Sequence, residues 1–253
     1  DLSSCPSYPS RIIQHHPKKP QLGPNTTQNT KQQLLKDQNQ TETMDEDDDV
    51  RSSPPPPPTE AAFLASRICN QLASIFSRPT APHPPPLDLM VASLSSAAAR
   101  DGNVFLYGVG REGLMLKALC MRLVHLGLRA HLVFDMTTPP ISRNDLLVAS
   151  AGPGGFSTVD AICGVAGSCG ARVVILTAQP DRVKVAGVEV CYVPAQTMAD
   201  DRPDGEEEVR PLMPMGSAYE GALYVLFEMV VYKLGEALAQ SPEAIRARHT
   251  NLE

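Results

Sequence analysis

The sequence contains no tryptophan, and aromatic side chains make up only 5% of its 253 residues, so a core must be built from aliphatic side chains. Hydrophobic residues reach 42%, which is enough for such a core. No apolar run approaches the roughly 20 residues of a membrane helix, and the N-terminus lacks the apolar segment of a signal peptide. The acidic run Asp45–Asp49 also argues against an organellar transit peptide, which is acid-poor. We therefore expect a cytoplasmic protein that has no membrane partner.

The sequence also lacks the features of metal sites and nucleic-acid surfaces. Its six cysteines form no CxxC pair and have no metal-ligand spacing, so we expect small core residues and no metal. The formal net charge is −6, whereas sequence-independent binding to nucleic acid requires a basic face. A nucleic-acid partner is therefore not expected, but a local basic pocket for a small phosphate is still allowed.

Composition divides the chain near residue 60. Residues 1–60 are rich in Gln, Asn, Thr, Pro and Ser and have few apolar residues, which predicts a disordered N-terminal tail. The first Met is Met44, and Met-Asp-Glu-Asp-Asp-Asp is typical of a protein start. Either residues 1–43 are not native and the chain begins at Met44, or the whole tail is native; N-terminal sequencing of the native protein separates these alternatives. Residues 61–253 are expected to form one folded domain.

From residue 61 onward, helix and strand signals alternate. Apolar residues at helical spacing predict helices at residues 64–76, 87–98, 112–126, 158–169 and 217–238, and a short one from Pro242. Short apolar runs predict strands at residues 104–107, 130–134, 146–149, 173–176 and 188–193. This order predicts an α/β fold, a three-layer α/β/α sandwich with a five-stranded parallel, doubly wound sheet. Ligands of such sheets bind at the carboxyl ends of the strands.

The loop after the first strand reads Gly-Val-Gly-Arg-Glu-Gly over residues 108–113. Glycines let the backbone approach a phosphate, and the N-terminus of the following helix attracts it. One interpretation is a dinucleotide site, because Asp135 stands at the end of the second strand, where such sites have an acid. The alternatives are a different phosphate ligand, or only a tight turn between strand and helix.

Several longer motifs follow one another in order: Tyr-Gly-Val-Gly-Arg-Glu-Gly-Leu-Met-Leu-Lys-Ala at 107–118, Met-Arg-Leu at 121–123, His-Leu-Gly at 125–127, Thr-Thr-Pro at 137–139, Pro-Met-Gly-Ser at 214–217 and Arg-Ala-Arg-His at 246–249. This set resembles the 6-phospho-3-hexuloisomerases, a branch of the sugar isomerase (SIS) domain family, including its plant-type members. The resemblance implies a flavodoxin-like five-stranded sheet and a homodimer or homotetramer with shared sites. It also implies a phosphorylated sugar as partner, a 6-phosphorylated ketohexose whose carbonyl moves between C3 and C2, with no metal, nucleotide or other cofactor.

The same resemblance implies two catalytic residues. Glu220 stands where the family keeps its base, and a partly buried carboxylate with a raised pKa can carry a proton from one carbon to the next. His249 is implied to open the sugar ring or to protonate an oxygen, across a subunit boundary. From the residues alone, Glu220 can also be a solvated glutamate in the first turn of a helix, and His249 a structural histidine.

The residues expected to bind the substrate or its phosphate lie in the loops after the first three strands: Gly108, Gly110, Arg111, Thr137, Thr138, Ser150, Gly152, Gly154, Gly155, Ser157 and Thr158. Two departures from the family pattern bear on them. Glu112 stands where the family has Ser, and a carboxylate repels a phosphate. Residues 151–156 read Ala-Gly-Pro-Gly-Gly-Phe in place of Ser-Gly-Ser-Gly-Glu-Thr, and Pro153 removes a backbone N–H donor.

Three hypotheses follow. The chain is a sugar-phosphate isomerase, a non-catalytic SIS module that senses a sugar phosphate or assembles with partners, or a dinucleotide-binding protein. The helix at 217–238 carries more apolar residues than one buried face requires, which fits either a subunit interface or a central place within one chain.

Overall fold

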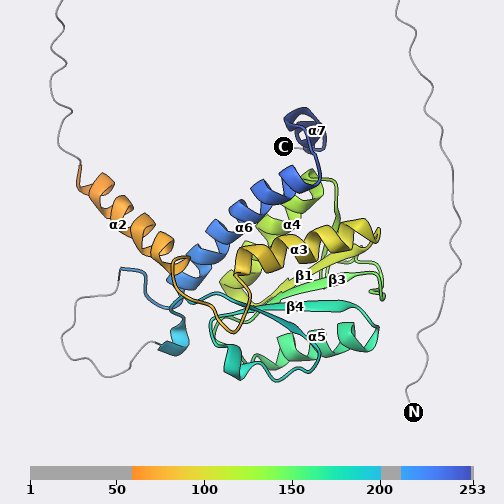
Figure 1. Ribbon diagram of the computed structural model, residues 1–253, viewed down its shortest axis with the longest axis horizontal. Helices are drawn as coiled ribbons and strands as arrows, with labels where there is room; N and C mark the ends of the chain where they lie inside the picture. The colour runs from red at the N-terminus through yellow and green to blue at the C-terminus, as the bar shows by residue number, and fades with distance from the viewer. Residues whose placement is uncertain (1–58, 201–211, 252–253) are drawn as a thin grey trace, which may run out of the picture. The chain divides into compact units, whose positions relative to one another are not determined.

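The computed structural model describes residues 59–200 and 212–251 (Figure 1). The expected N-terminal tail up to residue 58, and residues 201–211 and 252–253, lie outside the described residues. The first helix is α2 (Glu60–Ile75), which begins one residue before the expected domain boundary. Thr59 caps it, because its hydroxyl accepts a hydrogen bond from the Ala62 amide at 3.2 Å.

Five parallel strands form the sheet in the order β2–β1–β3–β4–β5. They are β1 (Asn103–Gly108), β2 (Arg129–Leu132), β3 (Leu146–Ser150), β4 (Arg172–Thr177) and β5 (Glu189–Tyr192). β3 is central and all of its residues are buried, which explains its continuous apolar sequence. The chain passes from β1 to β2 on one side and returns to β3 on the other, so the winding reverses between β1 and β3. Ligands of doubly wound sheets bind at such a reversal.

Helices cover both faces of the sheet (Figure 1). One face carries α3 (Pro86–Ala99), α4 (Gly110–His125) and α6 (Ser217–Ala237), and the other carries α5 (Ser157–Ser168). Side chains of β1 alternate between two cores: Val104 and Leu106 pack with the three helices, whereas Phe105 packs with α5. The predicted three-layer α/β/α sandwich with a five-stranded parallel sheet is confirmed.

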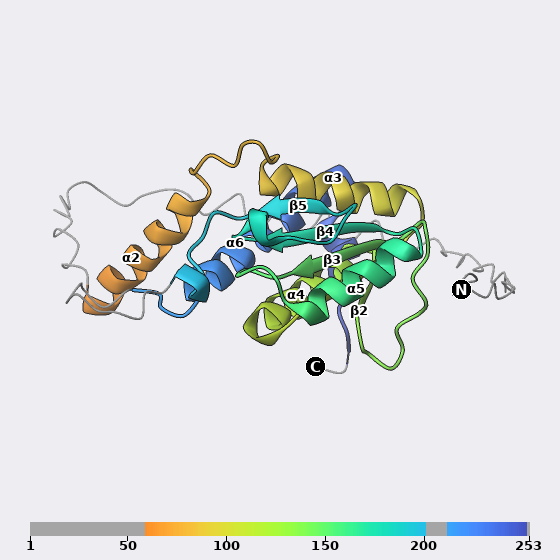
Figure 2. The same cartoon turned by 90° about the horizontal axis from the view of Figure 1, so that it is seen from below.

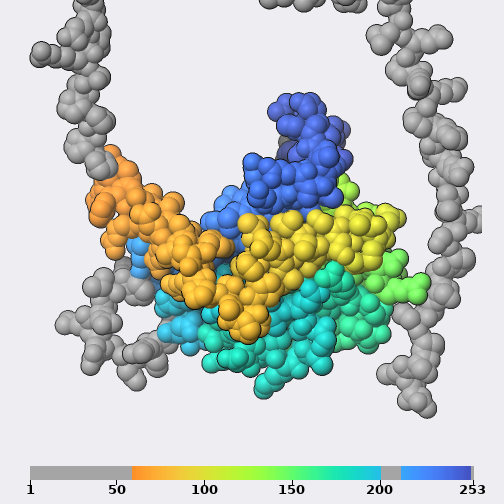
Figure 3. Space-filling model, in the orientation of Figure 1, coloured from red at the N-terminus to blue at the C-terminus, as the bar shows by residue number. Residues whose placement is uncertain are grey.

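Helix α6 lies at the centre of the larger core and packs against α3, α4 and α2. Gly221 leaves room for α2, because a Cβ at this position would lie 2.9 Å from Leu72 Cδ2. A central place within one chain therefore accounts for most of the apolar sequence of α6, but Tyr224 and Tyr232 remain exposed. The short helix α7 (Pro242–Ala247) follows and stands out from the body of the molecule (Figure 3).

Strand β2 ends at Leu132, two residues before its expected end. Val133 still donates to the Leu106 carbonyl at 3.0 Å, but Phe134 has a φ of 72° and the Asp135 amide turns back to the Leu132 carbonyl. A left-handed residue cannot continue a strand, so the chain turns here although its sequence remains apolar.

The connections at the carboxyl edge of the sheet contain two short 3₁₀ turns, η1 (Pro180–Arg182) and η2 (Met198–Asp200). Figure 2 shows the strands pointing toward the side on which α6 begins. The start of α6 and the loops after the strands therefore meet at one edge of the sheet. Among the helices within the described ranges, none is both long enough and apolar enough to span a membrane.

Candidate active site

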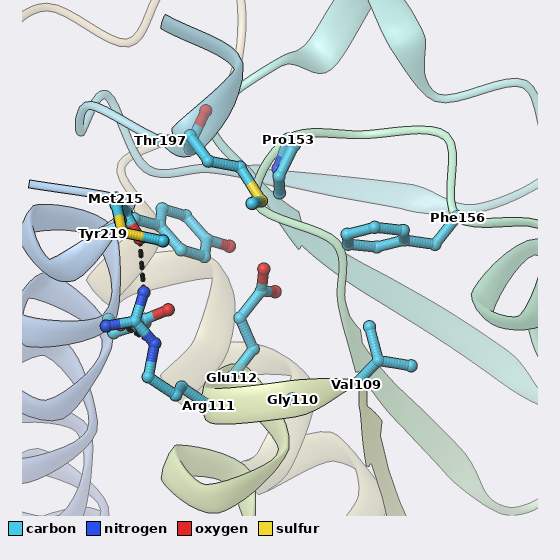
Figure 4. Close-up of a pocket in the computed structure, with 12 residues that line it drawn as sticks. Val109, Gly110, Arg111, Glu112, Pro153, Phe156, Thr197, Met215 and Tyr219 are labelled. Carbon is cyan, nitrogen blue, oxygen red and sulfur yellow. Dashed lines mark hydrogen bonds and ion pairs between the residues drawn. The ribbon is translucent and has the colours of Figure 1, made fainter. Parts of the chain in front are cut away.

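A cavity of about 280 Å³ lies at the carboxyl edge of the sheet, where the winding reverses (Figure 4). Its walls come from the loop after β1, the loop after β3, the segment around η2 and the first turn of α6. The lining residues are Val109, Gly110, Arg111, Glu112, Pro153, Phe156, Thr197, Met198, Met215, Gly216, Tyr219 and Glu220. The N-termini of α4 and α6 thus border one cavity, and each favours negative charge there.

Arg111 and Glu220 form an ion pair at this cavity. Arg111 Nε lies 3.1 Å from Glu220 Oε2, and the Arg111 guanidinium also donates to Ser217 Oγ at 3.2 Å and to the Met215 carbonyl. The Glu220 side chain is 17% exposed. Partial burial raises the pKa of Glu220, and the charge of Arg111 opposes part of that rise, so that the pKa stays above its ordinary value. The structure therefore brings together two residues that the sequence singled out on separate elements.

The Pro-Met-Gly-Ser segment before α6 sets the direction of the helix. Met215 and Gly216 have φ angles of 55° and 81°, in the left-handed region that glycine adopts readily and methionine rarely. Gly216 is the N-cap residue, and its carbonyl accepts hydrogen bonds from the amides of Tyr219 and Glu220. The strained turn therefore places the side chains of Tyr219 and Glu220 at the cavity.

Glu112 has contacts that the sequence did not predict. Its side chain is only 7% exposed, and its carboxylate accepts hydrogen bonds from the Ser150 hydroxyl at 2.5 Å and from the Gly152 amide at 3.0 and 3.1 Å. Burial raises the pKa of Glu112, the two hydrogen bonds lower it, and the negative charge of Glu220 raises it further; the net pKa lies above the ordinary value. Figure 4 shows the carboxylate turned toward the middle of the cavity, beside Tyr219.

Three donors expected to bind phosphate are thus engaged within the chain. The Ser150 hydroxyl and the Gly152 amide hold Glu112, and the Gly154 amide donates to the Ala151 carbonyl at 2.8 Å. The signal for this arrangement was present in the sequence. Two departures from the family pattern, Glu112 and the altered loop at 151–156, occur together, and the structure joins them directly.

The rest of the loop after β3 lies beside the cavity and does not line it. Gly154 and Gly155 form a turn with φ angles of 72° and 71°, and Ser157 and Thr158 begin α5. None of these four is among the lining residues, whereas Phe156 is. Their assignment to phosphate binding stays a prediction.

Three other expected site residues lie elsewhere. Thr138 donates to the Leu132 carbonyl at 2.6 Å, and Thr137 contacts Asp135, both in the turn after β2. His249 stacks on His125, the last residue of α4, with ring centroids 5.1 Å apart. Helix α4 is about 24 Å long at 1.5 Å per residue, and the cavity lies at its first turn. His249 is therefore remote from Glu220 within one chain.

Of the three glycines in the first loop, only Gly110 lines the cavity. Gly108 and Gly113 allow strand and helix to touch, because a Cβ on Gly113 would lie 2.5 Å from the Gly108 carbonyl oxygen. Asp135 lines a separate cavity of about 420 Å³ between α4 and β2, which shares no residue with the first. Within residues 59–200 and 212–251, no three His, Cys, Asp or Glu side chains are grouped to hold a metal ion.

Comparison with known proteins relates the chain to sugar-phosphate isomerases. It is 37% identical over 165 residues to a 3-hexulose-6-phosphate isomerase from Mycobacterium gastri, which is 64% of this chain and 80% of the relative. It is 31% identical over 151 residues to a 3-hexulose-6-phosphate isomerase from Bacillus subtilis, covering 60% of this chain and 80% of the relative. No protein-family model matches the chain.

The fold agrees with a solved structure of a hypothetical protein from Methanococcus jannaschii, for which a molecular function of 3-hexulose-6-phosphate isomerase was inferred. The TM-score is 0.60 at 21% identity, covering 77% of this chain and all of that one. At this identity the agreement concerns the fold, and the sequence relatives above carry the relationship. The chain belongs to the SIS-domain family, in the branch of the 3-hexulose-6-phosphate isomerases.

Proposed function

We propose that this chain is a sugar-phosphate isomerase that interconverts a 3-hexulose 6-phosphate and fructose 6-phosphate through an enediol. The observation that carries the proposal is the Arg111–Glu220 pair in the cavity at the reversal of the sheet. The fold alone would not support one reaction, because a single fold serves many functions. We assign the pair to this reaction because relatives at 31–37% identity are named for it.

Glu220 is the base in this proposal. Moving a carbonyl from C3 to C2 requires a group that takes the proton from C2 and returns it to C3. A carboxylate that is mostly buried, with its pKa above the ordinary value, is a stronger base than a solvated one. Arg111 lies against the same carboxylate and fixes its orientation, and its positive charge also favours an enediolate oxygen nearby.

The substrate phosphate is attracted by three features that border the cavity. Helix α4 begins at Gly110 and helix α6 begins at Ser217, and between them lies the guanidinium of Arg111, which is also paired with Glu220. Anions bind at such helix termini because the first amide groups have no partner within the helix. Since Ser150 and Gly152 hold Glu112, we assign the phosphate to the α4 and α6 side of the cavity.

His249 takes part in the proposal only through a second subunit. It lies at the end of α4 that is opposite the cavity. The outer faces of α4 and α6 expose apolar side chains: Leu114, Met121, Val124, Tyr224 and Tyr232. We propose a homodimer or homotetramer in which these faces meet and His249 of one subunit completes the site of another.

Mixing two inactive variants tests the shared site. Glu220→Gln and His249→Gln chains are each expected to have low turnover, and turnover should reappear when the two are unfolded and refolded together, because mixed oligomers contain some sites with both native residues. Lack of recovery in verified mixed oligomers would contradict the shared site.

The isomerase activity itself is tested by a coupled assay for fructose 6-phosphate formed from the 3-hexulose 6-phosphate. The wild-type chain should turn over, and Glu220→Gln should lose on the order of 10²–10⁴-fold in kcat. Glu189→Gln is the matched control, because Glu189 pairs with Arg172 at the opposite edge of the sheet. Absence of wild-type turnover, or equal turnover in Glu220→Gln, would refute the catalytic assignment.

A second candidate function is a non-catalytic SIS module that binds a sugar phosphate as a sensor or scaffold. One observation favours it: Glu112 occupies donors in the loop after β3 that were expected to hold phosphate. Thermal unfolding with sugar phosphates separates the candidates when turnover is measured on the same sample. A ligand at 100 times its Kd stabilises by about 2.7 kcal/mol, so stabilisation without turnover would favour the sensor.

A further inference from the structure

The cavity holds two carboxylates whose surroundings differ. Glu220 is paired with the cation Arg111 at 3.1 Å. Glu112 is held by the neutral donors Ser150 and Gly152, and within the part of the chain that the structure describes no Lys or Arg forms an ion pair with it. Two carboxyl groups in one site with unlike partners are suited to opposite tasks, one as a base and one as an acid.

The proposed reaction leaves one task without a residue in this cavity. An enediol forms only if a proton leaves carbon and another reaches the carbonyl oxygen. Glu220 serves the carbon. His249, which the resemblance assigns to ring opening or to an oxygen, is remote in the same chain and stacks on His125; supplied by a second subunit, it would open the sugar ring and leave the proton on the carbonyl oxygen to another residue. Glu112 lines the cavity, points toward its middle and is held in place by two hydrogen-bond donors.

We propose that Glu112 is a catalytic residue that moves the oxygen-bound protons of the isomerisation. The inference rests on the proposed function. Protonated Glu112 donates its proton to the C3 carbonyl oxygen while Glu220 removes the proton on C2, which yields the enediol. Glu112 then accepts the proton from the C2 hydroxyl while Glu220 returns its proton to C3. The carbonyl has moved from C3 to C2, both carboxyl groups are restored, and no oxidant or cofactor is consumed.

The contacts of Glu112 stabilise the form that remains after it has donated its proton. The carboxylate formed after proton donation is stabilised by the Ser150 hydroxyl and the Gly152 amide, and Ser150 is itself aligned by the Tyr219 hydroxyl at 3.2 Å. Tyr219 is 1% exposed and forms part of the cavity wall. Because its hydroxyl contacts Ser150, which in turn holds Glu112, it acts as a positioning residue. Gly152 is essential to this geometry, because a Cβ there would lie 3.0 Å from Glu112 Oε1.

The charged and titratable groups around Glu112 favour its protonated form. From α6 it faces Glu220, whose negative charge opposes a second carboxylate, and Tyr219, whose own pKa burial raises well above 10. On its own helix, Arg111 is engaged by Glu220 and the turn before α6. On the far side of the loop after β3, Arg182 donates to the Pro153 carbonyl. Burial therefore adds to the effect of Glu220 and keeps the pKa of Glu112 above its ordinary value.

The test compares wild type, Glu112→Gln, Glu112→Asp and the control Glu189→Gln in the isomerase assay across pH. A glutamine oxygen still accepts the Gly152 amide proton but the side chain cannot donate a proton as an acid. We expect Glu112→Gln to lower kcat by about 10²-fold or more with little change in KM. In wild type, kcat should fall as pH rises through the pKa of Glu112, and this fall should be missing from the residual activity of Glu112→Gln. Glu112→Asp keeps an acid and should recover part of the rate.

The other possible outcomes of this experiment would support or overturn the inference about Glu112. If wild type and Glu189→Gln turn over and Glu112→Gln matches them in kcat and pH profile, Glu112 only anchors the loop and the inference is wrong. A raised KM at unchanged kcat overturns it as well, because the residue would then serve binding alone. If Glu112→Gln does not fold, as judged by circular dichroism, Glu112→Asp decides: a lowered kcat supports the inference, and full wild-type kcat at every pH overturns it, because the shortened side chain should transfer the proton less well. If wild type itself has no turnover, the proposed function fails and this inference fails with it.

Discussion

Replacing Gly152 with alanine is a direct test of the packing around the candidate site. A Cβ at this position would lie 2.6 and 2.7 Å from Cε1 and Cδ1 of Tyr219, which is only 1% exposed. The φ of Gly152 is outside the left-handed region, so the backbone itself accepts alanine and the cost arises from the contact. Overpacking of a closed site costs about 1–3 kcal/mol.

Gly164→Ala is the matched comparison. Gly164 lies inside α5 and is exposed, and a Cβ added there would meet no atom of another described element within 4 Å. Alanine in an exposed helix interior is favoured over glycine by roughly 0.5–1 kcal/mol. The two variants should therefore differ by about 2 kcal/mol or more in the free energy of unfolding.

Thermal and urea unfolding, followed by circular dichroism, measure this difference. For a domain of this size about 1 kcal/mol corresponds to roughly 2–4 °C, so Gly152→Ala should melt at least about 4 °C below Gly164→Ala. Equal melting temperatures, or a more stable Gly152→Ala, would refute the close contact between Gly152 and Tyr219 and with it the described wall of the cavity.

Two further predictions concern buried carboxylates. Asp145 is 2% exposed and accepts hydrogen bonds from the amides of Asn103 and Ser142, both at 2.6 Å. Because Asp145→Ala removes the acceptor of both amides, it should lower the free energy of unfolding, measured in urea, by about 2–4 kcal/mol. A loss below about 0.5 kcal/mol would contradict the described network. The pKa of Glu112 is higher in the folded protein than in the unfolded chain, so ionising this group destabilises the fold as pH rises above the ordinary pKa of 4.5. Glu112→Gln has no such group, so its melting temperature relative to wild type should rise from pH 4.5 to pH 8. A difference that stays constant over this range would count against the raised pKa.

The sequence was sufficient to predict the fold because its signals are local. β3 is a short apolar run between polar turns. The alternation of such runs with segments of helical periodicity is enough to predict a parallel sheet. The end of β2 could not be predicted, since Val133 and Phe134 are apolar and only the left-handed φ of Phe134 ends the strand. The family relationship, predicted from ordered motifs, is confirmed by the sequence relatives.

The candidate site was harder to predict because it depends on contacts between distant segments. Arg111 and Glu220 were singled out through the resemblance, but their ion pair follows from the turn at Met215 that directs α6 toward α4. The sequence indicates Glu112 only as a charge next to a phosphate. Its hydrogen bonds to Ser150 and Gly152 depend on side-chain direction and on the distance between two loops, which no sequence pattern specifies.

The central claim, that Glu220 carries protons through an enediol in this cavity, is tested most directly by incubating the protein with fructose 6-phosphate in D₂O and following the C3 position by NMR. The account predicts that the wild-type chain interconverts fructose 6-phosphate and the 3-hexulose 6-phosphate, with deuterium at C3 wherever the proton on the Glu220 carboxyl exchanges with solvent before its return, and that Glu220→Gln does neither. C3 exchange at the same rate in Glu220→Gln, or neither exchange nor interconversion in wild type, would contradict it.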